Sequence, residues 1–188
     1  LTVGGALGRD PYEETEDQAA LRGLARDLAE REVAPRAAQG DETGEPPRLA
    51  AKALADADLL RVTIDERWGG LGYGDVEASI VLEEIARADV STAIWCQLTY
   101  NGPPRGIQHL GPPAMQERWL PAVAAGDALI SIGITEPDAG SAVQEMRTAL
   151  TDDGAGGWRL NGYKNYSTLG HAADGILVWC RWPGGAGA

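Results

Sequence analysis

The chain has 188 residues, of which 44% are hydrophobic and 23% are charged, as is typical of a globular protein with a hydrophobic core. Its formal net charge of -12 argues against a nucleic-acid-binding function, because a phosphate backbone requires a basic surface. No apolar run approaches the ~18 residues that a membrane-spanning helix needs, so we expect no membrane span.

The first two thirds of the sequence predict α-helices. Thr15 followed by Gln18 is typical of a capping box at the start of a helix. Apolar residues then recur at helical spacing as far as Val33, and we expect Pro35 to end this helix. Asp75 and Ser91 are the expected caps of a third and a fourth helix. The other helices are predicted over residues 47–57, 105–110 and 113–124.

The pattern changes to short strands near residue 126. Strands are predicted over residues 128–135, 146–151, 158–160 and 176–182. The composition of residues 152–157 predicts a hairpin turn. We therefore expect an α+β fold with a helical domain over residues 1–125 and a partial β-domain over residues 126–188.

The first candidate binding segment is Ile134–Ser141, with the sequence ITEPDAGS. A strand ends here, Pro137 stops the ladder, and Gly140-Ser141 forms a loop with backbone and hydroxyl donors. Such donors can face an anionic or carbonyl-rich ligand. The same residues are also common in an ordinary turn, so the segment alone leaves both interpretations open.

The second candidate segment is Asn161–Thr168, with the sequence NGYKNYST. An aromatic side chain followed by two hydroxyl residues can stack on a flat heteroaromatic ring and bond to its edge. A strand with one polar face and one packed tyrosine is the alternative.

Together, and behind a helical region, these segments resemble the acyl-CoA dehydrogenase family. Residues 135–141 resemble the T-E-P-x-A-G-S signature, and residues 160–168 resemble a second signature of that family. Further similar stretches are Met146-Arg147-Thr148, Ala173-Asp174, Trp68–Gly72 and Glu83–Asp89. The resemblance implies a helical N-terminal domain and the first part of a middle β-barrel. The family's C-terminal helical bundle is absent from this sequence.

The resemblance also implies FAD as cofactor. Its expected binding residues are Ile132, Ile134, Thr135, Gly140, Ser141, Tyr166, Ser167 and Thr168. In the family, the position of Thr135 faces the pyrimidine side of the flavin, that of Tyr166 packs against the ring, and that of Thr168 bonds near N5 or O4. Ser141, Trp95 and Tyr100 are the expected substrate contacts, with core packing as the alternative for the two aromatic residues.

The implied reaction is the α,β-dehydrogenation of an acyl-CoA or another acyl thioester, as in fatty acid metabolism, with hydride transfer to flavin N5. In most of the family the base is a glutamate of the absent C-terminal domain, so no catalytic residue is assigned here. Glu136 is interpreted as structural. The implied partners are electron-transfer flavoprotein or another electron acceptor, within a homo- or hetero-oligomer such as a dimer or tetramer.

The sequence departs from the family pattern at three places. Ala142, Leu169 and Tyr166-Ser167 stand where Asp, Asn and Trp-Ile are common. These departures leave the acyl group and the subfamily open. A flavin oxidase or monooxygenase of the same fold, an acyl-carrier-protein dehydrogenase and a non-catalytic partner subunit are the alternatives. We expect the natural chain to continue and the functional form to need the remaining polypeptide.

The remaining residues with reactive or bulky side chains have structural interpretations. Cys96 and Cys180 are expected to be buried, reduced thiols of a cytoplasmic protein. His109 and His171 lack a metal-ligand pattern, although His171 follows the flavin-side segment closely enough for a contact near the cofactor. The tryptophans interpreted as core or interface residues are Trp119, Trp158, Trp179 and Trp182.

Overall fold

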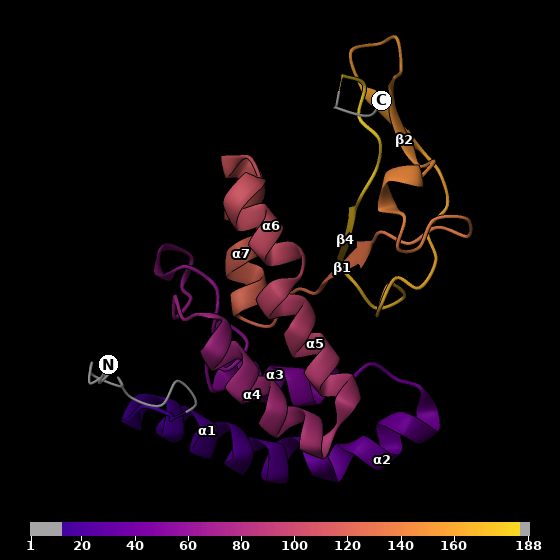
Figure 1. The fold of residues 1–188 in the computed structure, drawn as a ribbon. Helices are drawn as coiled ribbons and strands as arrows, with labels where there is room; N and C mark the ends of the chain where they lie inside the picture. The colour runs from indigo at the N-terminus through magenta and orange to yellow at the C-terminus, as the bar shows by residue number, and fades with distance from the viewer. Residues whose placement is uncertain (1–12, 185–188) are drawn as a thin grey trace, which may run out of the picture.

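The computed structural model describes residues 13–184, in which a group of helices precedes a smaller β part (Figure 1). The α-helices are α1 Glu16–Leu28, α2 Ala34–Thr43, α3 Arg48–Asp56, α4 Asp75–Ala88, α5 Val90–Asn101, α6 Pro103–Leu110 and α7 Pro113–Ala124. The strands are β1 Ile130–Gly133, β2 Ala149–Asp152, β3 Trp158–Asn161 and β4 Gly175–Val178. This order confirms the predicted α+β fold.

The first helix begins as predicted but continues past the predicted end. Thr15 Oγ1 accepts a hydrogen bond from the Gln18 N–H at 3.1 Å, and the Gln18 side chain accepts one from the Thr15 N–H at 2.9 Å. The prediction that Pro35 ends this helix is wrong. The chain passes through a π-helical turn, Ala29–Val33, and Pro35 lies in the first turn of α2. Pro35 lacks the N–H that would continue the helical ladder, and the π-helical turn directly before it accommodates this missing bond.

Two predicted helix caps are also wrong. Asp75 is the first residue of α4, and the preceding residue, Gly74, donates its N–H to the Glu77 carboxylate at 3.1 Å. Helix α5 is capped by Asp89, whose carboxylate accepts the N–H groups of Ser91 and Thr92 at 3.2 and 2.8 Å. Asp89 takes this role because α4 ends at Ala88, which places the aspartate where the chain turns into α5.

Two hydrophobic clusters hold the structure together. The larger cluster joins α1, α3, α4 and α5 through side chains such as Leu28, Leu54, Val81 and Trp95. The smaller cluster includes residues of α6, α7 and β1, with Leu177 of β4 packed against it. The apolar link over residues 59–64 supplies both clusters, so the helical and β parts share packed contacts.

The strands form two separate pairs. β1 and β4 are parallel, with Ile130 opposite Gly175, whereas β2 and β3 are antiparallel, with Ala149 opposite Asn161. The predicted hairpin turn joins β2 to β3, and the Asp153 carboxylate accepts two backbone N–H groups within it. β1 and β4 are shorter than the predicted strands, because the chain leaves the ladder after Gly133 and after Val178.

Other expectations concern burial and membrane spans. Cys96 is buried, and its burial raises the pKa of the thiol to about 12, whereas Cys180 is only half-buried. Trp158, Trp179 and Trp182 are 51%, 49% and 51% exposed, so they lie outside the core of the described chain. Their interpretation as interface residues stays a prediction. None of the helices between residues 13 and 184 is long and apolar enough to cross a membrane.

Candidate functional site

The two segments that resemble family signatures lie side by side in the β part. The Asn165 N–H donates to the Thr135 carbonyl at 2.8 Å, and Ser131 Oγ donates to the Thr168 carbonyl at 2.6 Å. Residues 165–168 therefore run alongside β1 in the opposite direction. The two signatures are therefore adjacent in space, although 30 residues separate Thr135 from Asn165 in the sequence.

A buried ion pair fastens this arrangement. Glu136 is 6% exposed, and Lys164 Nζ donates both to its carboxylate and to the Ile134 carbonyl, each at 2.8 Å. The backbone N–H groups of Arg147 and Thr148 also donate to the Glu136 carboxylate, at 2.6 and 2.9 Å. Burial alone would raise the pKa of Glu136, but these hydrogen bonds lower it to about 2. The ionised carboxylate thus ties together the segments that follow β1, precede β2 and follow β3.

The second segment reaches this position because Gly162 has no side chain. A Cβ at Gly162 would lie 2.2 Å from Thr148 Oγ1 and 2.6 Å from Thr148 Cα, which is closer than atoms can pack. The glycine therefore permits the end of β3 and the residues after it to lie close to the start of β2. Sequence comparison identified Gly162 as part of a signature, but the close approach itself has no local sequence signal.

The expected cofactor-binding residues differ in exposure. Tyr166 is 88% exposed and has a φ of 56°, in the left-handed region that side-chain-bearing residues rarely adopt. Thr168 is exposed as well, and Thr135 and Ser167 are half-buried. Tyr166 and Thr168 are thus accessible, whereas Thr135 and Ser167 are only partly so. Ile132 and Ile134 are half-buried beside them.

Gly140 and Ser141 occupy the exposed loop after β1. Glu136 and Ala139 exchange backbone hydrogen bonds of 3.0 and 3.3 Å, which close a tight turn with Pro137 at its tip. A Cβ at Gly140 would meet no atom within 4 Å, so open space surrounds the loop here. No hydrogen bond between this loop and Tyr166 is present in the described residues, and the placement of Ser141 against a ligand stays a prediction.

The chemistry of this surface suits a flavin better than a metal ion. Neutral hydroxyl groups can bond to the carbonyl and nitrogen edge of an isoalloxazine, and the exposed face of Tyr166 can pack against its ring. Within residues 13–184, no group of three potential metal ligands gathers. The residues present therefore fit FAD, the cofactor that the resemblance implies.

The predicted substrate contacts on α5 lie in the core. Trp95 is 2% exposed and Tyr100 is fully buried, with its hydroxyl donating to the Leu59 carbonyl. The guanidinium of Arg48 lies over the Trp95 ring, 5.6 Å from its centroid. This burial favours the core-packing alternative for both side chains, and a contact with the acyl group stays a prediction.

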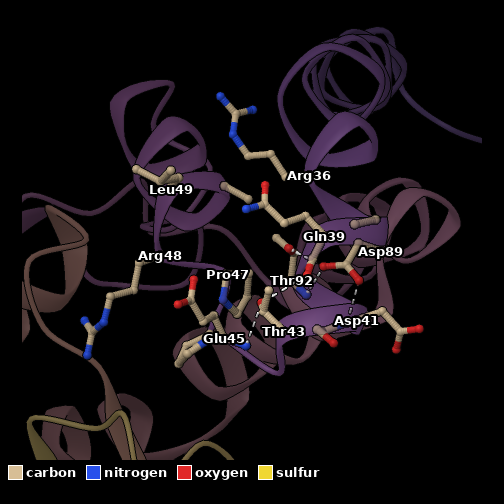
Figure 2. Close-up of a pocket in the computed structure, with 15 residues that line it drawn as sticks. Arg36, Gln39, Asp41, Thr43, Glu45, Pro47, Arg48, Leu49, Asp89 and Thr92 are labelled. Carbon is tan, nitrogen blue, oxygen red and sulfur yellow. Dashed lines mark hydrogen bonds between the residues drawn. The ribbon is translucent and has the colours of Figure 1, made fainter.

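A separate cavity of about 410 Å³ lies in the helical part, between the end of α2, the loop before α3 and the start of α5. Its lining includes Arg36, Glu45, Arg48 and Asp89. Arg36 and Arg48 lie on different sides of it and point in different directions (Figure 2). The charges do not converge on one point, and none of the predicted site residues lines this cavity.

Two family models match the chain. Residues 15–127 match the N-terminal domain of acyl-CoA dehydrogenase, and residues 131–188 match its middle domain.

Known relatives are similar over most of this chain. A probable acyl-CoA dehydrogenase of Mycobacterium tuberculosis is 37% identical over 86% of the chain and 41% of its own length. Cyclohex-1-ene-1-carbonyl-CoA dehydrogenase of Syntrophus aciditrophicus is 36% identical over 91% of the chain and 41% of its own length. The chain thus spans less than half the length of either relative.

A solved structure shares the fold. Glutaryl-CoA dehydrogenase of Mycobacterium smegmatis in complex with FADH2 superimposes with a TM-score of 0.84 and is 27% identical. The match covers 90% of this chain and 43% of that protein. The arrangement of helices and strands in residues 13–184 is therefore one that a flavin-containing structure also adopts.

Proposed function

The chain belongs to the acyl-CoA dehydrogenase family, and we propose that it supplies the helical domain and one wall of the flavin site of an FAD-dependent acyl-CoA dehydrogenase. One observation carries this proposal. The Glu136–Lys164 ion pair and the Asn165–Thr135 hydrogen bond bring the two signature segments together. The surface that results presents hydroxyl groups and an exposed aromatic ring.

Each group on this surface has a proposed role. The hydroxyls of Thr135 and Thr168 bond to the polar edge of the isoalloxazine, and Tyr166 covers part of the ring. The loop at Gly140-Ser141 faces the flavin pyrophosphate or the pantetheine arm of the substrate. Each neutral hydrogen bond contributes about 1 kcal/mol, so orientation depends on the set rather than on any one residue. When bound, FAD supplies the hydride-accepting chemistry that no amino-acid side chain provides.

We assign no catalytic base to this sequence. Glu136 is unsuited to remove an α-proton, because its carboxylate accepts three hydrogen bonds, from the backbone N–H groups of Arg147 and Thr148 and from Lys164 Nζ, and its pKa is about 2. A base needs a pKa nearer the working pH and a free path to the substrate. We propose that the base comes from polypeptide outside this sequence.

The substrate and partners follow from the same proposal. Relatives named for acyl-CoA and cyclohexene-carbonyl-CoA substrates support a CoA thioester as the substrate class. A flavin reduced by such a substrate needs an electron acceptor, for which we propose electron-transfer flavoprotein. We also propose that the protein works as a homo- or hetero-oligomer.

An anaerobic titration tests the proposed reaction. The native protein, isolated with every polypeptide that accompanies it, is mixed with straight-chain, branched, dicarboxylic and cyclic acyl-CoAs. We expect at least one of them to bleach the visible flavin band and to yield the matching enoyl-CoA. Bound FAD that stays oxidised with every acyl-CoA, but is reduced by an acyl-carrier-protein thioester, would contradict the CoA assignment. Flavin that no thioester reduces would contradict dehydrogenation itself.

A further inference from the structure

The end of the second signature and the turn that follows it each contain a residue with an unfavourable backbone conformation. Tyr166 and Leu169 have φ values of 56° and 54°, and they flank the segment that carries Ser167 and Thr168. For a residue with a large side chain, this left-handed conformation persists only when surrounding contacts enforce it. The contacts that hold this turn are therefore informative.

Apolar contacts anchor the turn to the helical part. Leu169 and Ala173 pack against the larger hydrophobic cluster, which consists of helical residues, the link before α4 and Leu129. Within the turn, the Gly170 N–H donates to the Ser167 carbonyl and the Ala172 N–H donates to the Leu169 carbonyl, each at 2.9 Å. Leu169 therefore gives the turn an apolar anchor on the helical part.

Arg48 of α3 also links the turn to the helical part. Arg48 Nη2 donates to the Ala172 carbonyl, and the same guanidinium lies over the buried Trp95 ring at 5.6 Å. Arg48 is the first residue of α3, where a positive charge opposes the helix dipole. Its position therefore does not favour the helix itself, and its favourable contacts are those with Trp95 and Ala172. Figure 2 shows its side chain pointing away from most of the other labelled residues that line the cavity.

We propose that Arg48 and Leu169 act as positioning residues that hold the turn Ser167–Ala173 on the helical part and thereby fix Tyr166 and Thr168 toward the flavin. This role rests on the proposed function, since it concerns the same flavin wall. Trp95 supplies the platform on which the guanidinium lies. Arg48 thereby connects α5, which carries the predicted substrate contacts, to the segment that carries the predicted flavin contacts.

The docking can be measured without any activity. Hydrogen–deuterium exchange of the Gly170 and Ala172 amides is compared between the parent protein and R48A, both isolated with their accompanying polypeptide. Loss of the hydrogen bond and the ring contact should speed exchange about tenfold. R48K keeps a donor but lacks the planar group, so it should restore only part of the protection. R36A is the matched control, because Arg36 lines the same cavity but bonds to Glu32 within its own helical region.

L169N provides an independent test of the apolar anchor. Asparagine tolerates the left-handed conformation, so this substitution keeps the backbone accessible while it removes the apolar contact. Exchange in the turn should again be faster than in the parent.

Melting temperatures of R48A and R36A should be alike, which separates local docking from general destabilisation.

The flavin supplies the readout that distinguishes positioning from a purely structural role. R48A should shift the visible absorption bands and the reduction potential of bound flavin, whereas R36A should leave both unchanged. Equal exchange rates in R48A and R36A would overturn the docking. Faster exchange with an unaltered flavin spectrum and potential would overturn the positioning role. A parent protein that binds no flavin would contradict the proposed function, while the exchange comparison would still decide the docking.

Discussion

Glu136 shows how one residue of a binding signature can serve the site without contacting the ligand. Its carboxylate is buried, and it remains charged because Lys164 and two backbone N–H groups compensate for the water that it has lost. Lys164 Nζ also donates to the Ile134 carbonyl, directly before Thr135. The position of the Thr135 hydroxyl therefore depends on the Glu136–Lys164 pair, in which Glu136 directly follows Thr135 and Lys164 bonds the carbonyl before it.

We expect K164M to destabilise the protein by about 3 kcal/mol, because it leaves a buried carboxylate without its counter-ion. The variant should also lose flavin affinity, since the two signature segments are no longer fastened. Chemical unfolding and flavin titration measure the two effects. K52M is the control, because Lys52 is half-exposed and pairs with the exposed Asp56. Equal stability of K164M and K52M would contradict the role given to the pair.

The low pKa of Glu136 predicts how its contribution varies with pH. The pKa of Glu136 is about 2 in the folded chain, below its ordinary value of 4.5, so the unfolded chain takes up the proton first as the pH falls. Stability from this group is fully present above the unfolded pKa and is lost as the pH falls toward the folded one. The difference in unfolding free energy between the parent and E136Q should therefore be constant above about pH 5.5 and shrink below it. A difference that grows on acidification would contradict the assignment.

At the scale of single residues, the sequence predicted the two signature segments but not the contacts between them. The flavin contacts that the resemblance implies at Thr135, Tyr166 and Thr168 stay predictions, whereas the structural interpretation of Glu136 agrees with its buried ion pair. Lys164 was not recognised as its partner, although it lies within the second signature. A pairing between residues that are far apart in the chain has no local pattern that could reveal it.

At the scale of the elements, α1 and α4 are joined by a second buried carboxylate. Glu84 is 2% exposed and accepts hydrogen bonds from Arg22, Arg26 and Arg87 at 2.8–2.9 Å. The hydrogen bonds from Arg26 are the largest cause that lowers its pKa, to about 2. One charge on α4 thereby holds two arginines of α1.

E84Q should weaken the junction between α1 and α4 by about 2–3 kcal/mol, because charge-assisted hydrogen bonds are replaced by neutral ones and arginine charge is left unmatched. Thermal and chemical unfolding measure the loss. E83Q is the matched control, since Glu83 is the preceding residue, has a 64% exposed side chain and contacts Arg22 alone. An equal loss in both variants would show that the buried position has no special importance.

The junction between β3 and β2 depends on Gly162. G162A should cost about 1–3 kcal/mol, because a methyl group would overlap Thr148 and force the strands apart. G23A is a contrasting control. Gly23 lies on the exposed face of α1, and a Cβ at this position would meet no atom within 4 Å. Alanine there should therefore stabilise the helix by about 0.5–1 kcal/mol. If G162A is as stable as the parent in chemical unfolding, the close approach is wrong.

The elements were predicted well where local patterns determine them. The capping box at Thr15 and the hairpin turn after β2 follow from short-range chemistry and are present. The end of the first helix was misplaced, because the π-helical turn that accommodates Pro35 leaves no mark on the apolar spacing. Asp89 was missed as a cap because its role depends on where α4 ends.

At the scale of the whole molecule, the β part presents a large aromatic surface. The rings of Trp158 and Trp182 lie 4.8 Å apart between centroids, and both side chains are about half exposed. In the described residues the two strand pairs form separate sheets, linked by a single bridge between Ala149 and Arg181. Exposed aromatic surface and open strand edges are typical of surfaces that bind further polypeptide. We expect the functional form to cover this surface with polypeptide from outside this sequence.

The fold and family could be predicted from the sequence because two signatures stand in order behind a helical region. The relative placement of those signatures could not, since it depends on the Glu136–Lys164 pair, on Gly162 and on the contacts of Arg48. Each contact joins residues that are far apart in the chain, within the β part for Glu136–Lys164 and Gly162–Thr148 and between the helical and β parts for Arg48. The proposed flavin wall is thus a property of the folded chain rather than of either segment.

The flavin content of the native protein tests this account most directly. The protein is isolated with its accompanying polypeptide, its flavin is released by denaturation, and the released flavin is identified and counted against the protein. We predict stoichiometric FAD in the parent and clear loss of FAD in K164M, with K52M like the parent. A parent protein that contains no FAD and binds none on titration would contradict the central claim.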